Sequence, residues 1–491
     1  MDSKKKPIVI LIFPKVSSNV VLKVMPFGIL SVAAQLRQNG FDAQIFDLNC
    51  EPQDRLAAKL ESEWKNIVYV GFSVFTGPMI QEAIALSAMI KASYSHLPIV
   101  WGGPHPTIMP ELTVSHPLID IVCCGEGEKT AVRLAQALES GKGCWDVPGI
   151  AYKKDGKVVF TAPVELIDVQ AADKEISLDL KNVDLEKYIF LNHGKRTAVF
   201  ITSRGCPYRC RFCWNLMFHK RRYAAWSSAK VMEELEPLRR MKIEKILILD
   251  SFVGSFQRVQ NLGDSFQRAG LDWAIEDGCR VDCHASKDFF RMLEDTGCTH
   301  VAFGSESGSQ RILDHISKDI KVEDIVKSAE ARVGTKISGR YQWMTGVPGE
   351  KKEDVLKTVR LIDKINKIKC FSAHSLELYL PYPGNELFEL ACQSGWEAPR
   401  GLEGWGKYRW QGRYPYHDEG TWFFKSVKYS NYFLQYAKLA EVSAFSANIK
   451  PIFQMAIKAF FPFAYLRWKM RTFDFPFEYQ AAELLRKTLE K

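Results

Sequence analysis

The sequence predicts an α/β protein in which two sheets of mainly parallel strands are followed by a helical C-terminal region. Short apolar runs alternate with helical patterns through the first 140 residues, and the same alternation returns from residue 196. Beyond residue 392 the alternation ends, and tryptophan and tyrosine become frequent. We therefore expect separate parts at residues 1–140, 141–195, 196–392 and 393–491.

The first part is predicted to be a doubly wound, Rossmann-like domain. Its strand candidates are residues 8–13, 43–46, 68–72, 99–101 and 121–124. Between the third and fourth runs, Met79, Ala83, Leu86 and Ile90 fall on one face of a helix. Such a sheet binds its ligand beyond the carboxyl ends of the strands, where the strand order reverses.

Small and polar residues stand at these strand ends. They are Ser73, Thr76, Gly102, Gly103, Gly125, Glu126 and Gly127. Glycine lets a bulky ligand approach the backbone, and hydroxyl or carboxylate groups can hydrogen-bond to it. Each glycine taken alone is better explained by a turn, so the ligand hypothesis depends on the whole set.

Residues 141–195 show a weaker pattern, with a hairpin predicted around Asp155 and Gly156 in an otherwise polar connector. From residue 196, strand candidates alternate with helices such as 231–241 and 353–368. The strands are residues 199–202, 246–250, 273–275, 300–303, 341–344 and 376–380. This pattern predicts a β/α barrel or partial barrel, whose chemistry belongs at the carboxyl ends of its strands.

The C-terminal part is predicted to be a helical, aromatic-rich lobe whose rings pack mainly as core. Its most apolar stretch, residues 459–466, is short, interrupted by Pro462 and flanked by Lys458 and Arg467, so we do not expect it to cross a membrane. The N-terminal apolar run ends at Pro14 without a cleavage site, which favours a cytoplasmic protein. Twelve cysteines in 491 residues are too few for a disulfide scaffold, and the net charge of +9 is modest.

Three cysteines, Cys206, Cys210 and Cys213, stand in the loop after the first predicted barrel strand. A closed structural zinc site needs four ligands, and the local set stops at three. Cys279 and Cys283 would complete a zinc site only if two distant loops met. Three thiols on one loop suit a 4Fe–4S cluster instead, with one iron left open to bind a small molecule.

With this motif the chain resembles the radical S-adenosylmethionine (SAM) enzymes. The segments "FGSESGSQRIL" (303–313), "TGVPGE" (345–350) and "LYLPYPGNELFE" (378–389) resemble, in order, the fourth-, fifth- and sixth-strand segments of that family. In the first part, "MPFGILSVAAQLRQNGFDAQIFD", "WGGPHPTIMPE" and "VCCGEGEKT" resemble the cobalamin-binding domain that precedes the barrel in one large class of these enzymes. The resemblance spans about residues 8–389.

The resemblance implies a set of SAM contacts. The three cysteines would hold the 4Fe–4S cluster, and SAM on its open iron would be cleaved to a 5′-deoxyadenosyl radical. The Phe212 backbone is expected near the adenine, and Glu306 and Ser307 near the amino acid or ribose. Arg340 or Arg280 would pair with the SAM carboxylate, although an ordinary salt bridge is an equal alternative for each arginine.

The resemblance also implies cobalamin between the first domain and the barrel. Ser73, Thr76 and Glu126 would hydrogen-bond to it. The glycines Gly102, Gly103, Gly125 and Gly127 would give it clearance. The loop "PKVSSNVVLKVMPFG" holds no histidine where some relatives carry a cobalt ligand, so no protein histidine, His105 included, is expected on the metal.

The implied function is methylation of an unactivated carbon in a small-molecule or natural-product substrate, with an electron donor such as flavodoxin or ferredoxin. Oxidative cyclisation or rearrangement without methyl transfer is an alternative that the sequence does not separate. A zinc-stabilised nucleic-acid binder, using the basic residues 220–222, is a remote alternative, so we expect no nucleic-acid partner. The basic, aromatic C-terminal lobe leaves peripheral membrane contact open. No individual catalytic residue is predicted.

Overall fold

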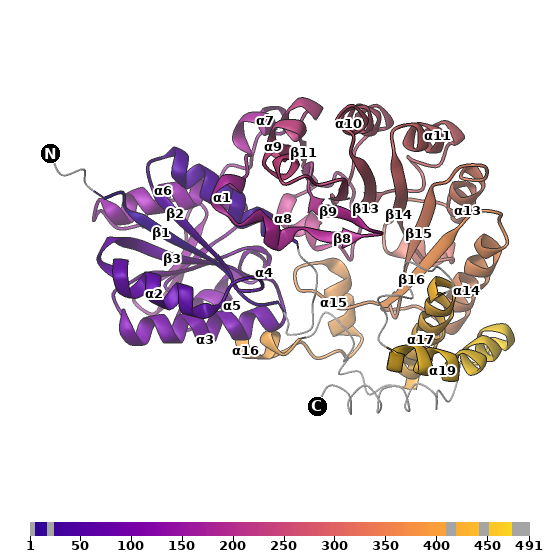
Figure 1. The fold of residues 1–491 in the computed structure, drawn as a ribbon. Helices are drawn as coiled ribbons and strands as arrows, with labels where there is room; N and C mark the ends of the chain where they lie inside the picture. Colours follow the sequence, from indigo (N-terminus) through magenta and orange to yellow (C-terminus); the bar gives the residue numbers. More distant parts are fainter. Residues whose placement is uncertain (1–4, 17–23, 409–418, 441–450, 474–491) are drawn as a thin grey trace.

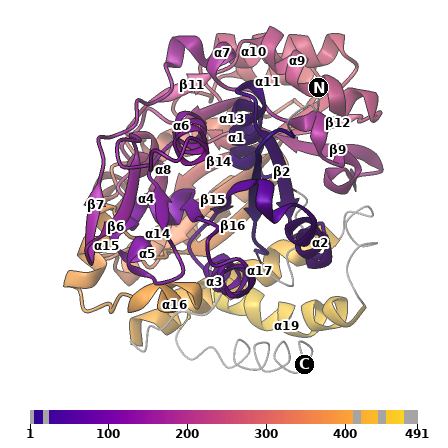
Figure 2. The ribbon, with the colours of Figure 1, turned by 90° about the vertical axis from the view of Figure 1, so that its left-hand side faces the viewer.

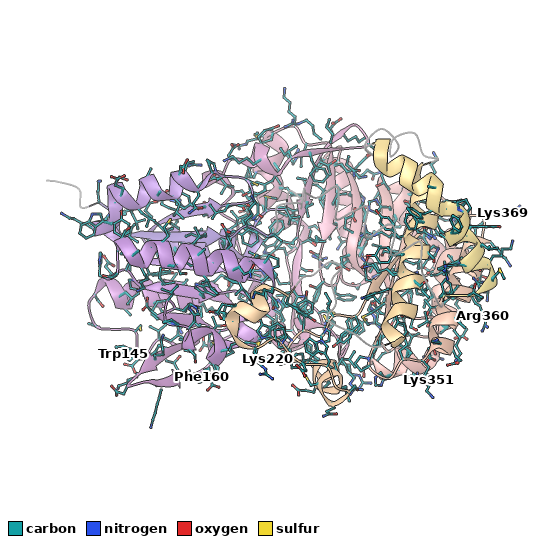
Figure 3. The ribbon with its side chains drawn as sticks, turned by 90° about the horizontal axis from the view of Figure 1, so that it is seen from below. Trp145, Phe160, Lys220, Lys351, Arg360 and Lys369 are labelled. Carbon is teal, nitrogen blue, oxygen red and sulfur yellow. The ribbon has the colours of Figure 1, made fainter. Side chains whose placement is uncertain are left out.

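The computed structural model describes residues 5–16, 24–408, 419–440 and 451–473. Two sheets lie side by side along the long axis of the molecule (Figure 1). Seen from below, Trp145 and Phe160 mark the end that carries the first sheet, and Arg360 and Lys369 mark the opposite end (Figure 3). In the described ranges, no helix is long and apolar enough to span a membrane.

The first sheet has seven strands in the order β2-β1-β3-β4-β5-β6-β7. They are β1 (Ile8–Phe13), β2 (Asp42–Asp47), β3 (Ile67–Ser73), β4 (Ile99–Gly102), β5 (Ile121–Cys123), β6 (Ile150–Lys154) and β7 (Lys157–Phe160). The five predicted strands are confirmed and pair in parallel, while the hairpin β6–β7 extends the sheet antiparallel. The chain leaves β1 in one direction and returns through β3 on its other side, which creates the switch point where such sheets bind ligands.

Helices cover both faces of this sheet. Helices α1 (Phe27–Gln38) and α6 (Gly127–Glu139) pack on one face, and α2 (Gln53–Glu63) and α3 (Pro78–Ser93) pack on the other. Alternate residues of β1 enter the two cores, which explains why its whole run is apolar. The short helices α4 (Pro104–Ile108) and α5 (Pro110–Ser115) follow β4. The doubly wound prediction is therefore confirmed.

The second sheet has the order β16-β15-β14-β13-β12-β9-β8. Its strands are β8 (Phe190–Asn192), β9 (Lys195–Phe200), β12 (Lys245–Leu249), β13 (Asp272–Cys279), β14 (Cys298–Glu306), β15 (Ser338–Thr345) and β16 (Ser372–Leu378). Six strands are parallel and overlap the six predicted ones, while β8 adds an antiparallel edge. In the described residues β8 and β16 do not pair with each other, so the sheet is a partial barrel.

Helices cover the convex face of the partial barrel. They are α9 (Ser228–Arg240), α10 (Phe256–Arg268), α11 (Lys287–Asp295), α12 (Gln310–His315), α13 (Val322–Ala331) and α14 (Lys352–Asn366). Three of them begin at serines, Ser227, Ser255 and Ser286, whose hydroxyls accept from backbone N–H groups of the first turn. The short hairpin β10 (Ser203–Gly205) and β11 (Tyr223–Ala225) encloses the cysteine loop and α8 (Trp214–His219).

The C-terminal part divides between two places, whereas the sequence predicts one lobe. After α15 (Glu386–Gln393), the segment with α16 (Gly401–Gly406) lies along α3 of the first domain (Figures 1 and 2). Its aromatic residues Trp396, Trp405 and Tyr408 are buried there, as predicted for core. Helices α17 (Glu419–Ala440) and α19 (Pro451–Met470) instead pack on each other, and α17 lies against β16.

Candidate functional site

The three cysteines lie in the loop between β10 and α8, just beyond the carboxyl end of β9. Cys210 is buried, and Cys206 and Cys213 are partly buried. Burial raises the pKa of all three, that of Cys213 to about 12, and Lys318 opposes the shift at each. Neighbouring thiols add to the rise at Cys206 and Cys213, and Glu306 adds to it at Cys210. Such thiols stay protonated until a metal binds them as thiolates. Three clustered thiols form a donor set that fits an iron–sulfur cluster.

No three Cys, His, Asp or Glu side chains of the described residues are grouped to hold a single metal ion. The second cysteine pair does not complete a zinc site among the described residues, although Cys283 reaches the cysteine loop. Cys279 is buried in β13, and the Cys283 sulfur shares a hydrogen bond of 3.0 Å with the Tyr208 hydroxyl. Of the basic residues in the zinc hypothesis, Arg221 and Arg222 donate to the carbonyls of Pro207 and Ile167.

The cysteine loop is clamped to the turn at residues 315–319, which follows α12. The Arg211 backbone N–H donates to the Ile316 carbonyl at 3.0 Å, and its guanidinium donates to the His315 carbonyl at 2.9 Å. Arg209 adds a two-point ion pair with Asp319, at 2.9 and 3.2 Å. These contacts hold the loop against that turn, although the two segments lie more than 100 residues apart in the sequence.

Arg280 braces the same loop from below. Its guanidinium stacks 3.6 Å from the centre of the Tyr208 ring and pairs through two nitrogens with Asp282, both at 3.0 Å. Nη2 also donates to the Lys318 carbonyl at 2.8 Å. The sequence predicts that Arg280 pairs with a SAM carboxylate; in the structure its side chain is buried and these donors are engaged within the protein.

Arg340 lies deeper in the partial barrel. It stands opposite Ala302 of β14, whereas Glu306 stands opposite Trp343. At about 3.3 Å per strand residue, Arg340 is about 10 Å below the level of Glu306. Its Nη2 is 2.9 Å from a carboxylate oxygen of Glu276 and donates to the Glu276 carbonyl at 2.8 Å. The structure therefore does not bring Arg340 to the cysteine loop.

Glu306 and Ser307 end β14 as expected, but their side chains have different surroundings. Glu306 has a φ of 58°, unusual for a residue with a side chain, and its carboxylate accepts from the Lys318 ammonium at 2.8 Å. Ser307 is fully buried, and its hydroxyl accepts from the Ser309 N–H at 3.2 Å. Only Glu306 of the two turns toward the cysteine side.

Phe212, in the interval between the last two cysteines, connects the loop to the sixth-strand motif. Its carbonyl accepts from the Asn385 side chain at 3.2 Å, and Asn385 also caps α15. Its ring packs against the buried cluster that contains Ile312 and Val347, from the fourth- and fifth-strand motifs. Segments matched separately in the sequence are thus in contact around one loop.

The strand-end residues of the first domain gather at the carboxyl edge of its sheet. Thr76 shares a hydrogen bond of 2.9 Å with His105, whose pKa burial lowers to about 4, so this histidine is neutral at physiological pH. Glu126 accepts from the Ile167 N–H at 2.8 Å and lies 3.6 Å from the His219 ring. Residues 17–23, in the loop where no cobalt-binding histidine is expected, lie outside the described residues.

At two of the four glycines predicted to give cobalamin clearance, contacts within the protein already explain why a side chain does not fit. Gly103 has a φ of 94°, and a Cβ there would lie 2.9 Å from both the Ser73 hydroxyl and the Val74 nitrogen. A Cβ on Gly127 would lie 3.1 Å from Val32 of α1. Gly102 and Gly125 are more open, with nearest atoms at 3.5 and 3.6 Å.

Lys318 is the residue near the cysteines that sequence reasoning missed. Its side chain is 9% exposed and lies close enough to Cys206, Cys210 and Cys213 to affect the pKa of each. It stands in "HISKDI", beyond the recognisable fourth-strand segment. A lysine in such a position is usually interpreted as a solvent-exposed residue at the end of a helix. No local pattern marks it, because tertiary contacts between the cysteine loop and the turn at residues 315–319 bring it beside the cysteines.

Two models of known protein families match the regions of the chain that contain the two sheets. The model described as B12 binding domain matches residues 15–135, and that of the Radical SAM superfamily matches residues 200–362. The chain is 31% identical over 376 residues to an uncharacterized methyltransferase, PH0819, of Pyrococcus horikoshii, covering 74% of this chain and 78% of that protein. The chain belongs to the cobalamin-binding radical SAM family.

Other members of this family differ in the reaction they are named for. The anaerobic magnesium-protoporphyrin IX monomethyl ester cyclase of Rubrivivax gelatinosus is 28% identical over 383 residues, 74% of this chain and 66% of the cyclase. Among solved structures, the radical SAM methyltransferase TsrM of Kitasatospora setae, with cobalamin and a [4Fe-4S] cluster bound, matches with a TM-score of 0.64 and 20% identity. That match covers 77% of this chain and 73% of TsrM, and it confirms the fold.

Proposed function

We propose that this radical SAM protein is a cobalamin-dependent methyltransferase that acts on an unactivated carbon of a small molecule. The observation that supports this most directly is the contact between α4, which follows β4, and α8, which follows Cys213. Because α4 and α8 stand at the carboxyl ends of their sheets, the ligand edge of the B12-binding domain meets the cysteine loop. A methyl carrier and a radical source would therefore serve one shared site.

The residues of the cysteine side fit a cluster and SAM. Cys206, Cys210 and Cys213 would ligate the iron, and Glu306 would bind the polar end of SAM. When bound, these groups supply reductive cleavage of the SAM sulfonium, and cobalamin supplies a transferable methyl group. The chain's own work is to orient these groups and to exclude water through the apolar packing of Phe212.

The residues of the first domain fit a corrinoid in part. Gly102 and Gly125 leave backbone open at the switch-point edge, and Ser73 ends β3 beside them. Thr76 and Glu126 already have partners within the chain, so their proposed bonds to cobalamin would have to share or replace those contacts. We propose that no protein histidine binds the cobalt, because the loop after β1, in which some relatives carry the ligand, contains no histidine in this sequence.

Methyl transfer and cyclisation differ in the products formed from SAM. Methyl donation leaves S-adenosylhomocysteine, whereas reductive cleavage leaves 5′-deoxyadenosine and methionine. Protein reconstituted anaerobically with iron, sulfide and cobalamin, and supplied with reductant and SAM, should form both nucleoside products. S-adenosylhomocysteine formation should require cobalamin. Formation of 5′-deoxyadenosine alone, with and without cobalamin, would favour the cyclase or rearrangement alternative.

Replacement of the cluster cysteines tests the cluster assignment separately. Each of Cys206→Ala, Cys210→Ala and Cys213→Ala should lose most of the bound iron and sulfide and all 5′-deoxyadenosine formation, because a cluster needs three thiolates. Cys392→Ala is the matched control, since this partly buried thiol lies at the end of α15. Iron and sulfide analysis measures the outcome, and full loading of the triple variant would contradict the proposal.

The partners are proposed from the same assignment. A one-electron donor such as flavodoxin or ferredoxin would reduce the cluster, and the substrate would be a small molecule. Absence of a nucleic-acid partner, peripheral membrane contact and a cytoplasmic location stay predictions.

A further inference from the structure

Helix α19 carries apolar side chains on two opposite sides, and one of them is largely exposed. On the inner side, the Phe460 ring packs on Phe433 of α17 with 5.5 Å between ring centres, and Trp468 is buried. On the outer side, Leu466 and Met470 are 56% and 59% exposed. A helix that is apolar all round is normally covered on every side, so the outer side is expected to have a partner.

The exposed residues form one stripe along the helix, which we call the outer face. Its members, all of them exposed, are Ala459, Pro462, Phe463, Leu466 and Met470. Their spacings of three, four and seven residues place them on one side of a helix. Tyr465 and Lys469 border the stripe, with the lysine ammonium 3.3 Å from the tyrosine hydroxyl. An apolar stripe with polar and basic groups at its edge is typical of a helix that lies in a membrane interface.

Helix α19 is held beside α14 by a shared carboxylate. Asp363 of α14 accepts from the Trp468 indole N–H at 2.8 Å. The same carboxylate pairs with Arg471, which directly follows α19. Because Asp363 already has a cation of its own, it does not neutralise the other basic residues around this junction.

Four exposed cations lie near the junction. Arg360, Lys364 and Lys367 are four and three residues apart along α14 and its C-cap, and Lys369 follows. Within the ranges that the structure describes, none of the four takes part in an ion pair. Figure 3 shows Arg360 and Lys369 at the end of the molecule that carries α19. Such a group of unpaired cations favours a surface that bears many negative charges.

A lipid surface matches this combination better than a second copy of the chain or a nucleic acid. Two copies joined through this surface would bring the same cations face to face, which is unfavourable. A nucleic acid would pair with the cations but would leave the outer face of α19 in water. An anionic membrane does both, because its phosphates pair with the cations and its acyl chains cover the apolar stripe. In the described residues no helix can span a membrane, so the contact would stay at its surface.

We propose that the protein binds an anionic membrane surface through α19. The outer face lies among the acyl chains, and the cations at the end of α14 lie against the lipid phosphates. The sequence leaves membrane contact open for the whole C-terminal lobe, and this proposal assigns it to one surface. It is independent of the proposed function, because neither the cysteine loop nor the first domain takes part.

Sedimentation of the full-length protein with sucrose-loaded vesicles measures this binding. The protein should bind vesicles of equal parts phosphatidylcholine and phosphatidylglycerol at least about 10-fold more tightly than vesicles of phosphatidylcholine alone. The reason is that each cation near an anionic surface favours binding about 5-fold. Raising the salt concentration from about 0.1 to about 0.5 M should weaken the binding to anionic vesicles. No binding to them, or equal binding to both compositions, would overturn the proposal.

Two double variants test the apolar and the charged part separately. Leu466→Ser with Met470→Ser should weaken binding to the anionic vesicles at least about 10-fold, because two apolar side chains are lost from the inserted stripe. Lys364→Gln with Lys367→Gln should weaken it about 30-fold, the effect of two lost cations. Unchanged binding in either variant would contradict the assignment to this surface. If the apolar variant does not fold, the charge variant and the comparison of lipids decide the proposal by themselves.

Matched controls lie at the opposite end of the molecule, in the β6–β7 hairpin and the loop before it. Trp145→Ser with Phe160→Ser removes two apolar side chains, each 53% exposed. Lys154→Gln with Lys157→Gln removes two exposed cations. Both control variants should bind the anionic vesicles as wild type does, and losses equal to those of the test variants would overturn the proposal.

Size-exclusion chromatography separates membrane binding from self-association through the same face. Wild type and the Leu466→Ser, Met470→Ser variant should elute at the same volume. A wild-type dimer that this variant converts to a monomer would assign the outer face to a second copy of the chain and would overturn the proposal.

Discussion

One carboxylate in the partial barrel, that of Glu276, joins charged residues from neighbouring strands. Glu276 of β13 accepts from the His300 ring at 2.6 Å and pairs with Arg340 at 2.9 Å, so three neighbouring strands meet at one carboxylate. Burial would raise the pKa of Glu276, but His300, Arg340 and Lys245 outweigh it and lower the pKa to about 2. This cluster lies below the proposed cofactor level, where it stiffens the wall.

The depressed pKa of Glu276 makes a pH-dependent contribution to stability. The folded state stabilises the ionised form of Glu276 relative to the unfolded chain, in which the carboxyl has its ordinary pKa of 4.5. The stabilisation is therefore present above pH 4.5 and lost as the pH falls toward 2. Glu276→Gln should lower the free energy of unfolding at pH 7 by about 3 kcal/mol.

Urea denaturation at several pH values measures this effect. Between pH 4.5 and the lowest pH at which the fold persists, the stability of Glu276→Gln should change less steeply than that of wild type. Glu330→Gln, at an exposed position on α13, should follow wild type. Parallel pH profiles for Glu276→Gln and wild type would show that the carboxylate is not preferentially stabilised.

At the scale of elements, the cysteine loop depends on partners from distant segments. The turn at residues 315–319 grips it through Arg209 and Arg211, and Arg280 supports Tyr208 within it. The motif spacing predicts that three thiols gather here. It does not predict the clamp, because the partners carry no recognisable pattern and meet only when the sheet places β9, β12, β13 and β14 in one order.

The segment with α16 is a second element whose role depends on packing. Trp405 is 1% exposed and lies in the core formed with α3, near Trp396 and Tyr408. Trp405→Ala should reduce the free energy of unfolding by about 3–5 kcal/mol, because it leaves a large cavity. It should also release the segment from α3, which limited proteolysis within residues 394–408 would detect.

Trp145 provides the control for this change, since it is 53% exposed at the far end of the first domain (Figure 3). Trp145→Ala should cost about 1 kcal/mol or less, as surface changes usually do. Equal effects of the two substitutions would mean that the α16 segment does not contribute to the core of the first domain.

At the scale of the whole molecule, buried polar contacts join the B12-binding domain to the partial barrel. Arg204 of β10 pairs with Glu128 of α6 at 2.5 Å, with side chains 13% and 5% exposed. Glu126 beside it approaches His219 of α8, and these contacts lower the pKa of Glu126 although burial acts in the opposite direction. The relative position of the two sheets is thus held by charges at the site itself.

Removal of Arg204 tests this connection. Arg204→Met should destabilise the protein by about 3–5 kcal/mol, because it leaves Glu128 buried without its cation, whereas Arg204→Met with Glu128→Leu should recover much of the loss. Thermal unfolding of the single and double variants measures the coupling. Arg209→Met, at a side chain 62% exposed, should change stability by about 1 kcal/mol or less. Equal losses in the single and double variants would exclude a cross-domain ion pair.

The sequence by itself determined the fold class, the parallel strands of both sheets, the three-cysteine loop and the family. Periodicity and motif spacing are local properties, and the parallel strands needed no distant information to be recognised. The tertiary structure decided which charged groups meet at the site. It engaged Arg280 and Arg340 within the protein, turned Ser307 inward and buried Lys318 beside the cysteines. Those outcomes depend on strand register, loop contacts and desolvation, which arise only when segments far apart in the chain pack together.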